Sequence, residues 1–481
     1  MLEKASDGLA VTSPQQLNNH NGPATTDKGK IIWINKESAE LIKSVDIHAC
    51  IGIGATSDGI IYTIDDKNAY QLNGNQLVKL NTPTLGHPSA ITTDNKGNIL
   101  VTDIGPDMQI KAYTSTGKLA YTCGIKGSRS IRGKFNEQAM YNMTSVAVDQ
   151  TGNVWAVENW DYPRRVSVWN PSNGKLIKDY IGNTGYAGTG CTLHETDPTI
   201  AYVGPIQLKL DKATRTSKVT NILWVPDHSK HESFEISPGS HVLGEHITTH
   251  INGQTQDYYY QPSYRDFNGH VFFIKQGDTM VPVSAVTTVG RICGIIAHNG
   301  SIDGVLWDEF KDCDPFDGVY WNDANNDAKV QRSECVIMPL ADAKKKNKRA
   351  RLSLPLFSRW GQRPADDLSF YVSGSGGTYK YTPLGYSPQG APIFGPQSLK
   401  GPLYDDTADY VPVDEEKILL NLSYKNYASA SRVAGVDMKT YETLWEYPNP
   451  YPGVHGSHKA TMPKPGIFDN NSRRVRFRFF T

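Results

Sequence analysis

The sequence predicts an all-β protein built from repeated antiparallel hairpins. The first observation is a short phrase that recurs at 54–66, 90–103 and 145–158 as GATSDGIIYTIDD, AITTDNKGNILVTD and SVAVDQTGNVWAVE. Each copy contains an apolar strand, a turn of Asp or Asn with Gly, and a second strand that ends in an acid. The second observation is the abundance of turn residues, with 43 Gly and 28 Pro among 481 residues, which favours many short strands over long helices.

A second hairpin follows two of these phrases, as IKAYTSTGKLAYTCG at 110–124 and VSVWNPSNGKLIKDYIG at 166–182. Two successive hairpins make a four-stranded sheet. Such sheets, repeated every roughly 40–55 residues, are typical of β-propeller blades. A β-sandwich has similar hairpins, but it does not explain why the same turn, strand and acid recur. We therefore predict a β-propeller of about seven four-stranded blades. On this estimate, roughly six or roughly eight blades are the alternatives.

Weaker copies of the phrase contribute to that count. They lie at 264–277, 299–310, 316–323, 365–385 and 431–450. The segment 202–227, with the sequence YVGPIQLKLDKATRTSKVTNILWVPD, is a strand pair that could form a further, divergent blade.

Two segments resemble a known repeat family. The segment 87–119, which begins HPSAITTDNKGNILVTD, resembles an NHL-type propeller repeat, with its proline, apolar pair, acid and Gly-Asn turn. The segment 141–176 resembles it too, although Met143 stands where the repeat has proline. Near the end of the chain, 431–450 resembles the blade phrase of quinoprotein-like propellers, with Thr440 and Tyr441 in place of a Thr-Gly turn. These resemblances imply a propeller fold and leave the function open.

The expected organisation has three parts. Residues 1–30 are polar, contain no hydrophobic core of a signal peptide, and are interpreted as a disordered arm or linker. Residues 31–466 are expected to form a single β-propeller domain, with insertions between blades near 226–256 and 311–357. Residues 467–481 are interpreted as a tail or a closing strand.

The charge balance excludes one class of partner. The chain has 49 Lys+Arg and 49 Asp+Glu, for a formal net charge of +0, whereas a general nucleic-acid binder needs excess positive charge. The basic run at 344–351 is therefore interpreted as a solvated loop. No apolar run approaches the roughly 18–20 residues that cross a bilayer, so no membrane span is expected.

The stretch NDANNDAKVQRSE at 322–334 has the spacing of a calcium-binding loop. Calcium prefers six to eight hard oxygen ligands, which side chains, a backbone carbonyl and a water can supply at alternating positions. The predicted ligands, with Lys329 acting through its carbonyl and Gln331 through a water, are Asp323, Asn325, Asp327, Lys329, Gln331 and Glu334. Val330 stands where such a loop has an apolar residue that packs against its neighbour.

One position of this stretch departs from the calcium-loop pattern. Ala328 stands where a calcium loop has glycine, because that residue adopts a positive φ, which costs roughly 1 kcal/mol for a residue with a β-carbon. The flanking sequence reads as strands instead of the helix pair of an EF-hand domain. We therefore predict an EF-hand-like loop inserted between strands, which binds calcium weakly as a structural ion, with an Asx-rich turn as the alternative.

Histidines and cysteines supply weaker candidates. Five histidines lie close together, namely His228, His231, His241, His246 and His250. His246 and His250 share a face of a helix or strand, so a transition-metal site competes with the simpler interpretation of scattered surface histidines in a loop. His455 and His458 form a second such pair. Cys313 and Cys335 bracket the 322–334 stretch and form either a disulfide or two small buried residues.

Two classes of function remain open on this evidence. One is a secreted or envelope-associated binding or scaffold module, extracellular or periplasmic, whose protein or carbohydrate ligand binds at the propeller face or channel. The tyrosines of YYYQPSYRD at 258–266 form either a sugar-stacking surface or alternating core positions. The other class is a propeller enzyme, either a carbohydrate-active lyase or lactonase or a quinoprotein-like dehydrogenase, with its site at the central channel. The sequence contains no G-x-S-x-G motif and no P-loop, and it names no catalytic residue.

Overall fold

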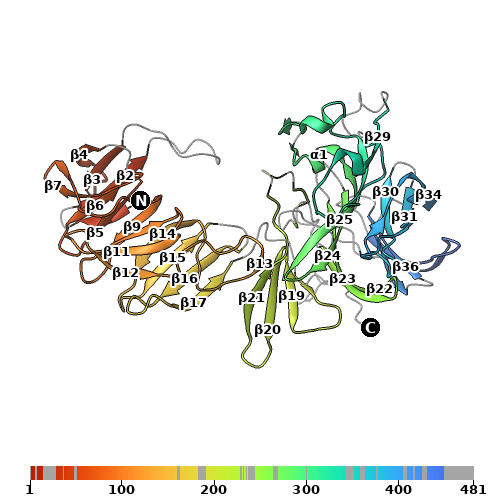
Figure 1. The fold of residues 1–481 in the computed structure, drawn as a ribbon, viewed down its shortest axis with the longest axis horizontal. Helices are drawn as coiled ribbons and strands as arrows, with labels where there is room; N and C mark the ends of the chain where they lie inside the picture. The colour runs from red at the N-terminus through yellow and green to blue at the C-terminus, as the bar shows by residue number, and fades with distance from the viewer. Residues whose placement is uncertain are drawn as a thin grey trace, which may run out of the picture. The chain divides into compact units, whose positions relative to one another are not determined.

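The computed structural model of the chain is nearly all β and divides into two compact units (Figure 1). The first unit comprises Met1–Ile131 and Phe135–Thr184, and the second comprises Arg132–Lys134 and Gly185–Thr481. The structure describes residues 2–5, 8–14, 29–35, 37–47, 51–159, 163–182, 191–227, 230, 232–234, 236, 244–263, 269–298, 301–341, 352–357, 363–374, 377–404, 409–414, 418–424 and 431–448.

In the described part of the first unit there are four antiparallel four-stranded sheets, and in each of them consecutive strands pair with one another. The first sheet comprises β1 (Leu2–Ala5), β2 (Gly8–Pro14), β3 (Gly29–Ile34) and β4 (Leu41–Ile47), and the second β5 (Gly52–Ala55), β6 (Ile61–Ile64), β7 (Ala69–Asn73) and β8 (Gln76–Lys79). The third comprises β9 (Pro88–Thr93), β10 (Ile99–Asp103), β11 (Gln109–Tyr113) and β12 (Leu119–Cys123), and the fourth β14 (Met143–Val148), β15 (Val154–Glu158), β16 (Arg165–Trp169) and β17 (Leu176–Ile181). The first strands of successive sheets contact one another, β1 with β5, β5 with β9 and β9 with β14, so the sheets follow one another like blades.

The repeated phrase forms the first hairpin of a blade because its aspartate closes the turn. Asp94 accepts hydrogen bonds from the backbone N–H groups of Lys96 and Asn98 between β9 and β10. Gly97 in this turn has a φ of 80°, a left-handed conformation that glycine adopts without steric cost. The same arrangement recurs between β14 and β15, where Asp149 accepts from the N–H groups at 151 and 153.

The acid at the end of the phrase also has a repeated structural role. Asp103 ends β10, is buried, and accepts from the backbone N–H of His87, which directly precedes β9. Its other oxygen lies 2.6 Å from Lys111 Nζ, on the third strand of the same sheet. Glu158 ends β15 in the same way and pairs with Arg165 on the third strand of its own sheet. The acid therefore ties the first and third strands of a blade together.

The second unit has larger and less regular sheets. A five-stranded sheet runs in the order β13 (Gly133–Lys134), β21 (Thr216–Ile222), β20 (Ile206–Asp211), β19 (Ile200–Val203) and β18 (Thr192–Leu193). A six-stranded sheet runs β22 (Glu245–Ile251), β23 (Gln254–Ser263), β24 (Gly269–Gln276), β25 (Thr279–Thr288), β28 (Gly318–Asn322) and β29 (Cys335–Met338). The six-stranded sheet supplies much of the largest hydrophobic core, which includes Phe272, Val286 and Trp321.

Smaller sheets complete the second unit. A three-stranded sheet contains β30 (Phe370–Gly374), β31 (Gly377–Tyr381) and β34 (Leu399–Tyr404), and a four-stranded sheet contains β35 (Asp409–Asp414), β36 (Ile418–Tyr424), β37 (Ser431–Asp437) and β38 (Thr443–Pro448). Two hairpins are β26 (Ile296–His298) with β27 (Ser301–Asp303) and β32 (Gly385–Tyr386) with β33 (Pro392–Ile393). Among the described residues, the helical segments include α1 (Val289–Ile292), η2 (Asp308–Phe310), η3 (Arg332–Glu334) and η4 (Pro396–Ser398). Within the described residues, no helix has the length and apolar character needed to cross a membrane.

The all-β class and the four-stranded antiparallel sheets are confirmed. The three strong phrases form β5–β6, β9–β10 and β14–β15, and the two second hairpins form β11–β12 and β16–β17. The strand pair expected at 202–227 is β20–β21, in a sheet of five strands. The blade count and the NHL assignment stay predictions.

The structure differs from the expected organisation at several places. Residues 1–30, expected to be a disordered arm or linker, contain β1 and β2 and the start of β3. The chain has two compact units where a single domain over 31–466 was expected. The expected insertion at 226–256 contains β22, and that at 311–357 contains β28 and β29, so both regions contribute strands to the six-stranded sheet. The tail at 467–481 and the basic run at 344–351 lie outside the described residues.

Candidate functional site

The predicted calcium ligands lie in the loop that joins β28 to β29, which we call the Asp323–Glu334 loop. β28 is a buried interior strand whose last two residues, Trp321 and Asn322, lead directly into the loop. The loop ends with the short helix η3, after which β29 returns along the edge of the sheet. This confirms the prediction of flanking strands in place of the helix pair of an EF-hand domain.

The first half of the loop is folded around the carboxylate of Asp323. Its Oδ1 accepts the backbone N–H of Asp327 at 3.2 Å, and its Oδ2 accepts the N–H of Ala328 at 3.0 Å. These bonds turn the chain so sharply that Ala328 adopts a φ of 58°. The positive φ predicted for the glycine position of a calcium loop is therefore present, although the residue carries a β-carbon.

The other end of the loop folds back on its own start through Glu334. Oε1 of Glu334 accepts the N–H of Ala324 at 3.0 Å, and Oε2 accepts the indole N–H of Trp321 at 3.1 Å. Val330 is 2% exposed and belongs to the core of the second unit, as predicted for the apolar position. Both ends of the loop are thus fixed to the six-stranded sheet.

The remaining predicted ligands lie along the middle of the loop. Asn325 Oδ1 accepts the N–H of Asp327, and Asp327 Oδ1 in turn accepts the N–H of Lys329. The amide of Gln331 donates to Asp327 Oδ2 at 2.8 Å. Oε1 of Gln331 is buried and has no hydrogen-bond partner among the described residues. A buried acceptor oxygen without a donor is unfavourable, and a bound cation is one group that could compensate it.

Acidic groups concentrate in this loop, and the pKa of Asp323 reflects it. Burial, together with the nearby carboxylates of Glu334 and Asp327, raises this pKa to about 6 despite the lowering effect of the backbone N–H bonds. A divalent cation would favour the ionised carboxylates and remove their mutual repulsion. The oxygen donors of the loop therefore fit a hard cation such as calcium.

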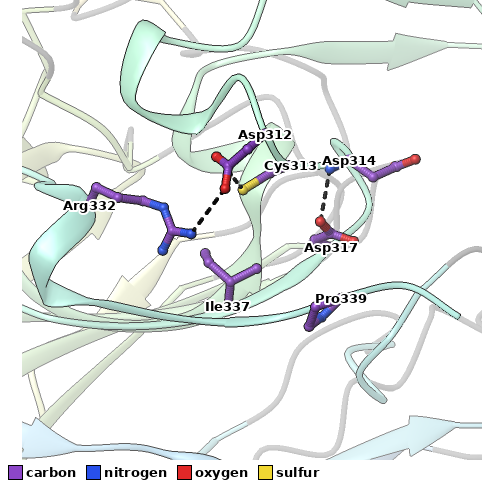
Figure 2. Close-up of a pocket in the computed structure, with 7 residues that line it drawn as sticks. All are labelled: Asp312, Cys313, Asp314, Asp317, Arg332, Ile337 and Pro339. Atoms are coloured by element: carbon purple, nitrogen blue, oxygen red, sulfur yellow. Dashed lines mark hydrogen bonds and ion pairs between the residues drawn. The ribbon is translucent and has the colours of Figure 1, made fainter.

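A small polar pocket lies beside this loop (Figure 2). It has a volume of about 430 Å³, and its lining residues are Asp312, Cys313, Asp314, Asp317, Arg332, Ile337 and Pro339. Figure 2 shows Arg332 extending toward the carboxylate of Asp312, at 3.7 Å. The two carboxylate oxygens of Asp317 accept hydrogen bonds from the backbone N–H groups of Asp314 and Leu340. The charges of the pocket are therefore largely engaged in holding its own walls.

The two cysteines that bracket the loop are free thiols in this structure, so the disulfide alternative is not formed. Both are partly buried and pack against the core, which agrees with the alternative of small buried residues. Burial raises the pKa of Cys313 to about 11 and that of Cys335 to about 12. Both thiols therefore stay protonated near neutral pH, and neither is activated as a nucleophile.

A second group of potential ligands lies elsewhere in the second unit, and sequence analysis found only one of its members. His194 directly follows β18, His246 lies in β22 and Asp257 lies in β23, and one ligand atom of each lies within 4.8 Å of the other two. Within the described part of the chain, these three residues are the group of His, Cys, Asp or Glu side chains whose ligand atoms lie close enough together to hold one metal ion. His194 and Asp257 belong to no motif, so the sequence held no local signal for them.

The electrostatics of this group favour a neutral His246 beside an ionised Asp257. Burial, helped by the neighbouring His194, lowers the pKa of His246 to about 3. Burial alone would raise the pKa of Asp257, but a hydrogen bond from Thr248 and the two histidines outweigh it, so this pKa is lowered. Neutral imidazole and ionised carboxylate are the forms that bind metal ions.

Other predicted positions have different outcomes. His250 is exposed and its ring lies near Thr255, apart from the group above. The sugar-stacking alternative for 258–266 is wrong for Tyr258, Tyr259 and Tyr260, which are at most 2% exposed, because β23 lies inside the sheet with packing on both faces. The predicted positions outside the described residues are His228, His231, His241, His455, His458 and 264–266.

The fold defines the class of protein: an all-β chain of blade-like antiparallel sheets. No protein-family model matches the chain, and no curated protein matches its sequence.

Solved structures give distant likenesses. A protein of unknown function from Bacteroides caccae is 14% identical, covers 53% of this chain and 88% of its own, and has a TM-score of 0.26. Glutaminyl cyclase of Myxococcus xanthus is 14% identical over 46% of this chain and 85% of its own, with a TM-score of 0.27. Hydrazine synthase of Kuenenia stuttgartiensis is 9% identical over 58% of this chain and 90% of its own, with a TM-score of 0.26. With TM-scores this low, none of these likenesses supports an inference about this chain.

Proposed function

We propose that this protein is a secreted or envelope-associated binding or scaffold module, an NHL-like β-propeller of about seven blades whose Asp323–Glu334 loop holds a structural calcium ion. The observation that carries the proposal is the geometry of that loop. Asp323 folds the chain so that Ala328 takes the positive φ of a calcium loop, and Glu334 closes the turn from its far end.

The donor set supports calcium over a softer metal. Asp323, Asp327 and Glu334 supply carboxylate oxygens, and Asn325 and Gln331 supply amide oxygens, which are the ligands of hard cations. The buried Oε1 of Gln331 has no partner among the described residues, which leaves it open to a cation or a bound water. The hydrogen bonds that now occupy the carboxylates would be partly exchanged for calcium, so we expect weak affinity, with a Kd of about 10⁻⁴–10⁻³ M. That range suits extracellular calcium and motivates the proposed location.

Calorimetric titration of the full chain with Ca²⁺, paired with urea denaturation, tests this function. At a free Ca²⁺ concentration ten times the Kd, the bound ion should raise the free energy of unfolding by about 1.4 kcal/mol. Glu334→Gln keeps the shape of the side chain and removes one carboxylate, so it should abolish both the binding heat and the stabilisation. Glu442→Gln removes the same charge from an exposed position of the second unit and should change neither.

A chain without binding heat, and with equal stability in Ca²⁺ and EGTA, would contradict the proposal and favour the Asx-rich turn. Binding that persists in Glu334→Gln would place the ion elsewhere. The enzyme alternative is checked separately with a panel of lactones, uronic-acid glycans and quinone-linked alcohols. Turnover of any of these by the calcium-loaded protein would favour the alternative over a binding module.

A further inference from the structure

We propose that His194, His246 and Asp257 form a binding site for a zinc-class divalent metal ion, separate from the calcium loop. The three side chains come from two different sheets of the second unit. His194 directly follows β18, the edge strand of the five-stranded sheet, whereas His246 and Asp257 lie on β22 and β23 of the six-stranded sheet. β18 and β22 contact each other, so an ion at this place would join the two sheet edges.

The ligand atoms lie close enough together to converge on one tetrahedral metal ion. Nε2 of His194 lies 3.7 Å from Asp257 Oδ2, and Nε2 of His246 lies 3.6 Å from Asp257 Oδ1. Zinc binds histidine nitrogen and carboxylate oxygen at about 2.0–2.2 Å, which places neighbouring ligand atoms of a tetrahedron about 3.3–3.6 Å apart. These two distances end on different oxygens of Asp257, and with one ligand atom from each residue the three atoms lie within 4.8 Å of one another. The side chains would therefore have to close in by up to about 1 Å to complete the site. Two histidines and one carboxylate also match the ligand types of zinc centres that keep a fourth position for water.

His246 supplies the second, independent observation. This residue is 4% exposed, and both of its ring nitrogens are buried without a hydrogen-bond partner among the described residues. Its ring stacks on Tyr202, with centroids 5.1 Å apart, and lies against His194 at 4.0 Å. Buried histidine nitrogens normally find a partner, so a ring held by packing next to a carboxylate, with both nitrogens unpaired within the described part of the chain, points to a ligand-binding role.

The surrounding groups orient Asp257 for this role. Thr248 stands opposite Asp257 across the β22–β23 pair and donates its hydroxyl to Oδ1 at 2.9 Å. The backbone N–H of Thr248 is bound by Glu195, which also pairs with Arg363. Such outer partners fix the ligands of metal centres. Lys275 lies 3.4 Å from Asp257 Oδ2 and balances its charge, and because Lys275 is half exposed it can move away when a metal ion binds.

One contact must change when the metal binds. Nδ1 of His194 accepts the backbone N–H groups of Thr196 and Asp197 at 3.2 and 3.1 Å, which leaves the ring proton on Nε2. Coordination through Nε2 requires the proton on Nδ1, so those two local bonds must open. They are made within three residues of the histidine at the partly exposed end of β18, so their loss is small against a metal–nitrogen bond.

Cobalt titration of the full chain, after treatment with EDTA, tests the site. Co²⁺ in a tetrahedral site absorbs visible light, so the wild-type protein should develop this absorption with one equivalent of Co²⁺ and lose it on addition of Zn²⁺. Loss of a residue that only orients a metal ligand weakens metal binding by up to about 100-fold. His194→Gln removes a ligand itself, so it should weaken Co²⁺ binding by about 100-fold or more. His250→Gln changes an exposed histidine of β22 that lies outside the group and should leave binding unchanged.

Equal affinities of His194→Gln and wild type would overturn the proposal and assign any binding to other histidines. Wild-type protein without tetrahedral absorption would overturn it too. Asp257→Asn, which keeps the shape of the side chain, serves as the second variant and should lose the absorption. The melting temperatures of all variants in EDTA, compared with wild type, show that the chains are folded. Glu334→Gln should keep the cobalt absorption, which separates this site from the calcium loop.

Discussion

Asp323 Oδ2 accepts the backbone N–H of Ala328 at 3.0 Å, and this contact holds Ala328 in a left-handed conformation with a φ of 58°. The loop thus has the backbone conformation of a calcium loop at a residue, Ala328, whose β-carbon disfavours that conformation. Two effects compete at this position: the hydrogen bond to a buried carboxylate stabilises the turn, and the β-carbon of alanine opposes it by about 1 kcal/mol.

Replacing Ala328 with glycine should therefore stabilise the protein. Glycine adopts this φ freely but loses more conformational freedom on folding, so the net gain should be about 0.5–1 kcal/mol in the free energy of unfolding. Urea denaturation measures it. Ala324→Gly makes the same chemical change in the same loop at a residue without a positive φ, and it should destabilise slightly. Equal effects of the two variants would contradict the strain at Ala328.

This loop also shows what could be predicted from sequence. The positions of Asp323 and Glu334, the need for a positive φ at Ala328 and the burial of Val330 were all contained in a stretch of twelve residues, so spacing alone indicated them. The hairpins around Asp94 and Asp149 were predictable for the same reason, because an Asx turn is formed by neighbours in the chain.

Features that depend on distant contacts could not be predicted. His194 lies beside His246 only because the edges of two sheets meet, and no local pattern records that pairing. The burial of Tyr258 and its neighbours depends on β23 lying between β22 and β24, whereas alternation along a strand cannot say which sheets cover both faces. The five- and six-stranded sheets of the second unit likewise result from added strands such as β13 and β28, whose partners lie far away in sequence.

Glu158→Gln should be among the most destabilising single changes in the first unit. Glu158 accepts hydrogen bonds from Arg129 at 3.2 Å and Arg165 at 3.0 Å, and all three side chains are 0% exposed. Removing the negative charge takes the shared carboxylate from two buried guanidinium groups, of which Arg165 keeps Asp179 at 2.9 Å, and should cost about 3–5 kcal/mol. Chemical denaturation measures the loss. Glu37→Gln, at an exposed position of the same unit, is the control and should change stability little; a similar loss in both variants would refute a buried network.

Acid should weaken the tie between Asp103 and the strands of its blade. Burial alone would raise the pKa of Asp103, but hydrogen bonds from Lys111 and from the N–H groups of Gly105 and His87 outweigh it and lower the pKa. A lowered pKa in the folded state means that the unfolded chain takes up protons first as the pH falls. The stability from Asp103 is therefore fully present above about pH 4, the unfolded value, and is lost as the pH falls through the folded pKa.

Asp103→Asn makes this pH dependence measurable. The variant keeps an oxygen for the two N–H donors but faces Lys111 with an uncharged amide, so it should be less stable than wild type at pH 7. The difference should shrink when both proteins are denatured with urea near pH 3. Asp46→Asn removes an exposed carboxylate paired with Lys30 and should show a small effect at both pH values. A difference for Asp103→Asn that does not depend on pH would mean that the charge of Asp103 contributes nothing.

Two turn glycines of the same blade separate backbone strain from steric contact. Gly97 and Gly117 have nearly the same φ, 80° and 85°, so alanine is strained equally at both. A β-carbon at Gly97 would meet nothing within 4 Å, whereas one at Gly117 would lie 2.4 Å from the backbone carbon of Asn81. Gly97→Ala should therefore cost about 1 kcal/mol from strain alone.

Gly117→Ala should cost clearly more than Gly97→Ala, because the atoms that its β-carbon meets are backbone atoms that cannot rotate away. Urea denaturation of the two variants and of wild type gives the comparison. Gly152→Ala repeats the Gly97 test in the next blade, where φ is 86° and a β-carbon again meets nothing within 4 Å. It should match Gly97→Ala. Equal losses at Gly97 and Gly117 would show that the backbone around Asn81 moves to make room for the β-carbon. In that case this segment does not fix the position of the β11–β12 hairpin.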